Sequence, residues 1–172
     1  MFRTSKAERE IRAALPELYP RLWRYAIALT GRQDWGEELA QATSIRALEQ
    51  HRHFKAGTHV DRWCFRLAKN IWLNELRARR VRTGNGLMPI EETEIPSTAQ
   101  SAEANIFAHE VLNSIYALPE AQRVTVLLTY VEGHSYKETA DILEIPIGTV
   151  MSRLAAARKS LSFLNQDRLE QS

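Results

Sequence analysis

The stretch that decides the fold of this chain is Gly133–Lys159, GHSYKETADILEIPIGTVMSRLAAARK. Ser135 and Glu138 form the Ser-x-x-Glu pattern of a capping box, in which each side chain accepts a hydrogen bond from the other residue's backbone N–H. Pro146 cannot continue the preceding helix but suits the start of the next one. Ala140 is small, so two crossing helices can approach closely there. The stretch therefore predicts a helix-turn-helix, whose second helix normally enters the major groove of DNA.

The second helix of this stretch carries its apolar residues on one side, and we expect Val150, Leu154 and Ala157 to face inward. An ordinary helical hairpin inside a protein core also fits the stretch, because capping boxes and small residues at helix crossings are common. The rest of the chain has to decide between these two interpretations.

Helical periodicity also extends over the N-terminal part of the chain. Apolar residues from Leu15 to Leu29 recur at steps of three and four and end at Gly31, and Asp34 can cap the helix that follows. The period breaks over residues 51–59 and returns at about Val60, where a third helix begins. The residues expected to face inward are Trp35, Leu39, Ala42, Ile45 and Leu48 in the second helix and Trp63, Leu67, Ile71 and Leu76 in the third.

This pattern predicts two small helical domains. Residues 10–82 form the first, a bundle of three or four helices, and residues 103–165 form the second, with four short helices that include the helix-turn-helix. Residues 83–102 mix Gly, Pro, Ser and Thr with glutamates, which is typical of a flexible linker. The sequence has no strand-like alternation of any length and no internal repeat, so the predicted fold class is all-α.

The composition excludes several classes of protein. Hydrophobic residues make up 44% of the 172 residues, enough to bury a core. Cys64 is the single cysteine, which excludes an internal disulfide and fits a reducing cytoplasm. No apolar run reaches the roughly 20 residues that span a bilayer, and the charged N-terminal segment lacks the apolar stretch of a signal peptide. We expect a cytoplasmic protein that does not insert into a membrane.

The charge distribution is uneven along the chain. The net charge is only +2, yet residues 62–82 hold seven basic residues and one acidic residue, whereas residues 83–110 hold five glutamates and no basic residue. A basic helix face attracts phosphate, although many charged helix faces are simply solvated. Charge alone leaves nucleic-acid binding and a solvated surface both open.

Two blocks of residues carry a more specific signal. The first block is Glu38-Leu39-x-Gln41-x-Thr43-x-x-Arg46-Ala47-Leu48, then Phe54-x-x-Gly57-Thr58-x-x-x-x-Trp63-x-Phe65-x-x-Ala68-x-Asn70 and Glu75-Leu76-Arg77-Ala78-Arg79-Arg80. The second block is Leu118-Pro119-Glu120-x-x-Arg123, then Glu132-Gly133-x-Ser135-Tyr136-x-Glu138-x-Ala140 and Ile145-Pro146-x-Gly148-Thr149-Val150-x-Ser152-Arg153-Leu154. In this order the blocks resemble regions 2 and 4 of the extracytoplasmic-function (ECF) sigma factors of the sigma-70 family.

The resemblance covers about residues 10–165 and implies an RNA polymerase sigma factor, not an enzyme, that needs no cofactor. It implies three partners, namely the β′ clamp of core RNA polymerase, promoter DNA and an anti-sigma factor, and no small-molecule substrate. The implied polymerase-binding residues are Glu38, Leu39, Gln41 and Ile45. Those implied for the −10 element are His59, Arg66, Lys69, Asn70, Asn74, Arg77, Arg79 and Arg80. Those implied for the −35 element are Thr149, Met151, Ser152, Arg153, Ala155, Arg158 and Lys159.

The sequence departs from the family pattern in both blocks. Ala42 stands where the polymerase-binding helix usually has an acid, and Met151 stands where the recognition helix usually has Lys or Arg. Ala155 and Ala156 replace larger or charged residues. Because base readout needs hydrogen-bond donors and acceptors, we expect −35 recognition to be altered or weak, with Met151 and Ala155 able to touch thymine methyl groups.

These departures are also compatible with a second interpretation, a sigma-like decoy that binds an anti-sigma factor without engaging DNA. A decoy has no need of the basic residues Arg77, Arg79, Arg80 and Arg82 or of two joined domains. We therefore prefer the sigma factor and keep the decoy as the alternative.

The histidines near Cys64 and the position of Trp72 give weaker functional signals. His51, His53, His59 and Cys64 lie close in sequence but follow no zinc-site spacing, so we predict no metal site. Cys64 is expected to be a small buried hydrophobe. Trp72 lies one position past the inward Ile71, so we expect it to be partly exposed.

Overall fold

A computed structural model of the chain describes residues 5–83, 111 and 113–170. These residues form helices and turns without a β-strand, which confirms the all-α prediction. The predicted linker, apart from its first residue, lies outside the described residues. Within the described part, no helix is long and apolar enough to cross a membrane.

The first helical unit consists of α1 (Lys6–Thr30), α2 (Gln33–Glu49), the 3₁₀ turn η1 (His51–His53) and α3 (Val60–Thr83). Helix α1 begins at Ser5, whose hydroxyl accepts a hydrogen bond from the backbone N–H of Glu8. It ends at Gly31, whose φ of +73° is the left-handed conformation that favours glycine at a helix end.

Helix α2 crosses α1 closely at Gly36, and its buried face is rotated from the predicted one. A Cβ atom added at Gly36 would lie 2.8 Å from the backbone of Ile27, so only glycine fits this crossing. The prediction that Ala42 and Ile45 face inward is wrong, because both are exposed, Ile45 by 59%. The buried residues of α2 are Gly36, Leu39, Ala40, Thr43 and Ala47.

The start of α2 also differs from the prediction. The helix begins at Gln33, and Asp34 lies in its first turn rather than capping it. The Asp34 carboxylate accepts from the Trp35 backbone N–H and from the Arg32 guanidinium. These hydrogen bonds, that from Arg32 above all, lower the pKa of Asp34.

Helix α3 is buried on a wider stripe than a single packed face would give. Phe65 is fully buried with its ring centroid 4.9 Å from that of Tyr25. Trp72 is only 5% exposed, so the prediction of partial exposure is wrong. The residues predicted to face inward, Trp63, Leu67, Ile71 and Leu76, are partly buried and pack against the core. The stripe is wide because α3 packs on α1 and α2 and also on α6 of the second unit.

The second helical unit contains α5 (Glu120–Val126), the π-helical turn η2 (Leu127–Val131), α6 (Tyr136–Leu143) and α7 (Ile147–Glu170). The capping box is confirmed, with 3.2 Å between the Glu138 nitrogen and the Ser135 hydroxyl oxygen and 2.9 Å for the return bond. Val150, Leu154 and Ala157 are buried as predicted, together with Ala140. Helices α6 and α7 thus form the predicted helix-turn-helix.

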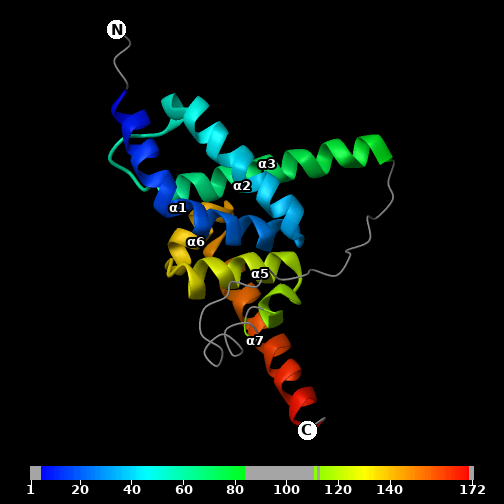
Figure 1. Ribbon diagram of the computed structural model, residues 1–172. Helices are drawn as coiled ribbons and strands as arrows, with labels where there is room; N and C mark the ends of the chain where they lie inside the picture. The colour runs from blue at the N-terminus through cyan, green and yellow to red at the C-terminus, as the bar shows by residue number, and fades with distance from the viewer. Residues whose placement is uncertain (1–4, 84–110, 112, 171–172) are drawn as a thin grey trace, which may run out of the picture.

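The two units pack against each other rather than lying apart. Figure 1 shows α5 and α6 against α1 and α3, while the C-terminal end of α3 projects away from the bundle and α7 points in another direction. The larger apolar core crosses the boundary between the units. Its members from the second unit are Tyr116, Val124, Leu127, Leu128, Ile142 and Leu143.

Candidate nucleic-acid interfaces and the contact between the units

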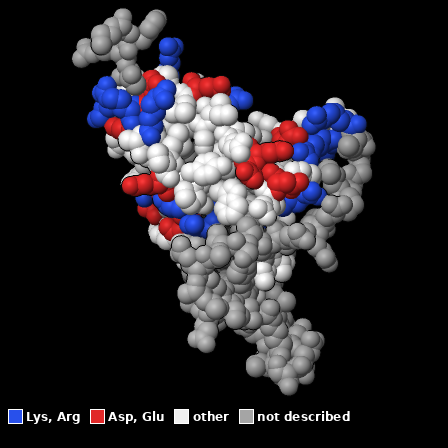
Figure 2. Space-filling view, in the orientation of Figure 1, with Lys and Arg blue, Asp and Glu red and all other residues white. Residues whose placement is uncertain are grey.

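The part of α3 from Asn70 to its C-terminal end presents polar and basic side chains to solvent. Asn70, Asn74, Arg77 and Arg80 are all exposed, at the helical spacing that the sequence predicted. Figure 2 shows basic side chains gathered at the projecting end of α3. Arg77 lies 3.4 Å from the Asn74 side-chain oxygen. His59, which immediately precedes α3, is exposed as well.

Arg79 occupies a different environment from its basic neighbours. Its guanidinium lies over the ring of Trp35, 4.1 Å from the centroid, and donates to the Glu75 carboxylate at 2.8 Å. Arg82 donates to the same carboxylate at 3.1 Å. The hydrogen bond from Arg79 is the main reason that the pKa of Glu75 is lowered. The side chain of Arg79 therefore supports the packing of α3 on α2.

The N-terminal half of α3 is covered by the second unit, which the sequence did not predict. Arg62 forms an ion pair with Glu138 at 2.5 Å, and Arg66 donates to the backbone oxygen of Asp141 at 2.8 Å. Lys69 donates to the backbone oxygen of Leu143 at 2.9 Å and also pairs with the carboxylate of Glu144. Arg66 and Lys69, two of the residues implied for the −10 element, thus contact α6 in this arrangement.

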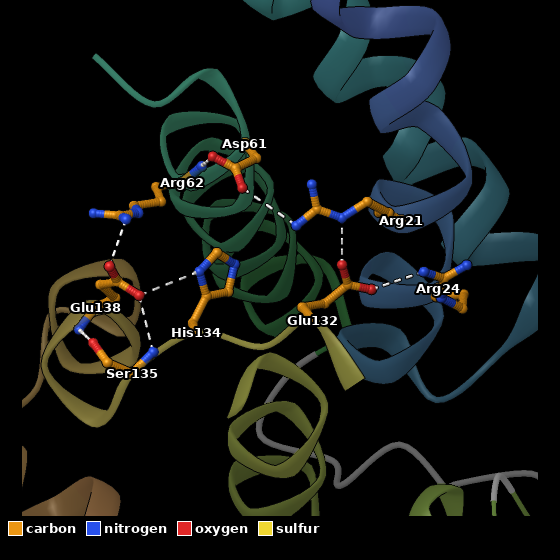
Figure 3. Close-up of polar contacts among 8 residues, drawn as sticks. All are labelled: Arg21, Arg24, Asp61, Arg62, Glu132, His134, Ser135 and Glu138. Carbon is orange, nitrogen blue, oxygen red and sulfur yellow. Dashed lines mark hydrogen bonds and ion pairs between the residues drawn. The ribbon is translucent and has the colours of Figure 1, made fainter. Parts of the chain in front are cut away.

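A second set of contacts joins the units on the α1 side. The Glu132 carboxylate, whose side chain is 2% exposed, accepts from Arg21 at 2.5 Å and from Arg24 at 2.9 Å (Figure 3). Arg21 also contacts Asp61 at 3.2 Å. Partners more than 100 positions apart leave no pattern in a single sequence, which is why sequence reasoning missed Glu132 in this role.

Arg123 is the most buried cation of this contact, at 7% exposure. Its Nε donates to the backbone oxygen of Ala28 at 2.6 Å, and its Nη1 donates to those of Tyr116 and Leu118 at 3.0 and 3.4 Å. The Ala28 carbonyl belongs to the last turn of α1, where helical carbonyls lack intrahelical donors. Burial lowers the pKa of Arg123. This arginine therefore caps α1 from the second unit.

His134 lies between the two sets of contacts (Figure 3). Its ring meets the Phe65 ring edge-on with 5.7 Å between centroids, and its Nδ1 lies 3.8 Å from the Glu138 carboxylate. Burial is the largest effect on this imidazole and lowers its pKa. His134 is therefore disfavoured as a cation while the two units are in contact.

The exposed face of α7 matches the set implied for the −35 element only in part. Met151 is 54% exposed, and Ser152, Ala155 and Lys159 are exposed too. Thr149 and Arg153 are half-buried. Arg158 donates to the hydroxyl of Tyr130 at 3.1 Å.

Sequence reasoning missed Tyr130, a 56% exposed residue of η2. Hydrogen bonding with Tyr136 and then with Arg158 lowers the pKa of the Tyr130 phenol. The phenol therefore holds a basic side chain of α7 in place, and the sequence signal for it is a tyrosine on each side of the Glu132-Gly133 turn.

The residues implied for polymerase binding do not share one environment. Glu38, Gln41 and Ile45 are exposed on α2, with Gln41 donating to Glu37 at 3.5 Å. Leu39 is buried in the core, so its side chain is not part of the exposed surface of α2 in this arrangement. The physical reason is the close crossing at Gly36, which turns the Leu39 side of α2 toward the core.

The sulfur and imidazole groups near α3 do not form a metal site in the described part of the chain, where no three His, Cys, Asp or Glu side chains gather. Cys64 is buried as predicted, and burial raises the pKa of its thiol to about 12. His51 instead uses its Nδ1 to contact the backbone oxygen of Leu48 at 2.9 Å.

Comparison with known proteins assigns the two units. The family model for sigma-70 region 2 matches residues 16–82, and the model for sigma-70 region 4 matches residues 108–161. The chain therefore has the two-region architecture of a sigma-70-type transcription initiation factor.

Relatives of known function narrow this class. The chain is 30% identical to the ECF RNA polymerase sigma factor EcfG of Rhodopseudomonas palustris over 94% of this chain and 86% of that protein. It is 31% identical to the ECF RNA polymerase sigma factor SigL of Mycobacterium tuberculosis over 91% of this chain and 89% of that protein. The crystal structure of the sigma factor RpoE of Bartonella quintana, in complex with the anti-sigma factor NepR, matches with a TM-score of 0.74 at 26% identity, over 91% of this chain and 97% of that chain. The protein belongs to the ECF RNA polymerase sigma factors, which supports the sigma-factor interpretation over the decoy.

Proposed function

We propose that the exposed part of α3 from Asn70 onward binds the −10 element, that the exposed face of α7 contacts the −35 element, and that α2 binds the β′ clamp of core RNA polymerase. The observation that carries this proposal is the group of exposed polar and basic side chains on the projecting part of α3. This surface lies on the part of the first unit that the second unit does not cover.

On the −10 side, Arg77 and Arg80 are suited to phosphates and the two asparagines to base edges. Guanidinium groups on a helix neutralise phosphates and release counterions, which supplies sequence-independent affinity. Asn70 and Asn74 carry both donors and acceptors, which is what readout of an unpaired base requires. His59 adds an exposed ring at the start of the same helix. Arg79, held over Trp35, contributes by orienting α3.

On the −35 side, α7 offers few hydrogen-bonding groups to base edges. Met151 and Ala155 lie on the exposed face and suit thymine methyl groups, whereas Ser152 and Lys159 suit phosphate or base oxygens. The Ser152 hydroxyl already donates to the Thr149 backbone oxygen at 3.0 Å. We therefore propose a −35 contact that depends more on phosphate and shape than on direct base readout.

Three further parts of the proposal rest on the relatives and the predicted boundaries. The RpoE structure contains an anti-sigma factor, and we propose a partner of the same class for this chain. The proposed domains remain residues 10–82 and 103–165, joined by an acidic linker over residues 83–102. A subunit of RNA polymerase acts on cytoplasmic DNA, so we propose a cytoplasmic location.

The test uses holoenzyme reconstituted from core polymerase and this protein. Binding to a −10 non-template strand is measured from low to moderate salt, together with promoter-dependent transcription. Arg77→Ala and Arg80→Ala should each weaken binding and reduce the slope of log K against log salt by about 0.7, the value for one single-strand phosphate contact.

Arg12→Ala is the matched control, since it removes one exposed arginine from α1. It should leave the slope unchanged. Unchanged slopes for both α3 variants would overturn the −10 assignment, and the absence of any promoter-dependent transcript would overturn the proposal as a whole.

A further inference from the structure

We propose that α6 is an intramolecular competitor of −10 DNA, which occupies the N-terminal half of α3 with acceptors that stand in for nucleic-acid phosphates. This inference rests on the proposed function of α3. It adds that the sigma factor hides part of its −10 surface by itself, without another protein.

The acceptors that α6 offers have the chemistry of a phosphate backbone. Arg66 and Lys69 each donate to a backbone oxygen at the C-terminal end of α6, at 2.8 and 2.9 Å. The C-terminal end of a helix carries unpaired carbonyls and a partial negative charge. Glu144, one residue beyond the helix, adds a full negative charge on Lys69, and Glu138 adds another on Arg62. Three cations that could hold phosphates therefore all have acidic or carbonyl partners within the chain.

These contacts leave several donors of the same interface unpaired. The Nε atoms of Arg62 and Arg66 and the Nε2 atom of His134 are buried without a hydrogen-bond partner among the described residues. A buried polar atom without a partner lowers the stability of the contact that buries it. An interface of this kind is easier to open than a fully paired one. Phosphate oxygens, of which each nucleotide brings several, could pair with the arginines once α6 moves away.

The ion pairs on α3 are also only partly shielded from water. The side chains of Arg62 and Glu138 are about one third exposed, and that of Glu144 is about half exposed. Pairs of this exposure are screened by salt and contribute little each. Salt and DNA phosphates therefore compete with these ion pairs for the cations of α3, while Ile142 and Leu143 of α6 stay packed in the shared apolar core.

In the closed arrangement, in which α6 contacts α3, the two proposed DNA-binding surfaces differ in exposure. Met151, Ser152 and Lys159 of α7 stay exposed while α6 covers Arg62, Arg66 and Lys69. A −35 contact is therefore compatible with the closed arrangement, whereas full engagement of the −10 strand along α3 is not. The structure thus implies an order of events. Contact with the −35 element can precede the separation of α6 from α3, whereas full contact with the −10 element requires that separation.

The test separates opening from DNA binding by measuring each of them. Glu138→Gln with Glu144→Gln removes both charges, and glutamine in place of Glu138 also completes a capping box, so α6 stays folded. Opening is followed by energy transfer between dyes on Ala13→Cys in α1 and Lys137→Cys in α6, both exposed positions, with buried Cys64 unlabelled. The matched control is Glu17→Gln with Glu37→Gln, which removes two exposed carboxylates from α1 and α2 of the first unit.

We expect the double glutamine variant to lower energy transfer and to bind the −10 strand about two- to fivefold more tightly than the control, the range expected for pairs of this exposure. Unchanged energy transfer would overturn the competitor role. Lower energy transfer with equal DNA binding would also overturn the competition, and would count against the −10 assignment of this half of α3. Equal gains in the control would mean that net charge alone is responsible and would likewise overturn it.

Discussion

The contact between the two units has two sides that differ in burial and in chemistry. On the α1 side, Arg123 is buried and donates to backbone oxygens, and the buried Glu132 carboxylate accepts from two arginines. On the α3 side, Arg62 and Lys69 meet glutamates that remain partly in water. Buried groups lose much when a partner is removed, whereas half-exposed pairs exchange partners readily. The comparison indicates that the α1 side holds the units together and that the α3 side can be released.

The largest expected effect comes from breaking the α1 side at Arg123. Arg123→Met would leave the oxygens of Ala28, Tyr116 and Leu118 without this donor. We expect the free energy of unfolding to fall by about 2–4 kcal/mol, because buried acceptors without partners are costly. Chemical denaturation measures the change. Arg46→Met, at an exposed position of α2, should change it by less than about 0.5 kcal/mol. A loss at Arg123 as small as that would contradict the anchoring role.

A smaller effect is expected from Glu132→Gln on the same side. This change keeps the shape of the side chain but removes the charge that faces Arg21 and Arg24. We expect a loss of about 1–3 kcal/mol in the free energy of unfolding, the range for a hydrogen bond to a charged group. The loss should persist at about 0.5 M salt, since buried pairs are screened much less than exposed ones. If salt abolished the difference in the free energy of unfolding between the variant and the parent protein, the α1 side would be screened like an exposed ion pair, which would contradict the contrast between the two sides.

The smallest effect concerns pH and His134. The imidazole faces Asp61 and Arg62 of α3, Arg21 of α1 and Glu138 of α6, and burial lowers its pKa in the closed arrangement. An open form, with an ordinary pKa of about 6.5, therefore binds the proton more readily. The closed arrangement keeps its full stability above about pH 6.5 and loses stability as the pH falls below it, down to the lowered pKa. Energy transfer between α1 and α6 should fall slightly between about pH 7 and about pH 5, and His134→Asn should flatten this dependence. A rise in energy transfer on acidification would contradict the sign of the effect.

Much of the local structure could be predicted from the sequence because its causes are local. The capping box at Ser135 and Glu138, the helix end at Gly31 and the turn before α7 depend on neighbouring residues and backbone chemistry. The inward face of α7 followed from a simple period because one side of that helix is packed. Helix α3 is packed on two sides, and there the expected exposure of Trp72 was wrong.

The sequence by itself determined the helices, the helix-turn-helix and the two blocks that mark an ECF sigma factor. Only the tertiary structure decided which basic residues are available, since Arg77 and Arg80 are exposed while Arg66 and Lys69 contact α6. The physical reason is that charge and hydrophobic period are properties of one segment of sequence. Whether a basic side chain is available for binding depends instead on which distant segment of the chain packs against it. A carboxylate more than 100 residues away, such as Glu132 against Arg21, leaves no signal in the local pattern.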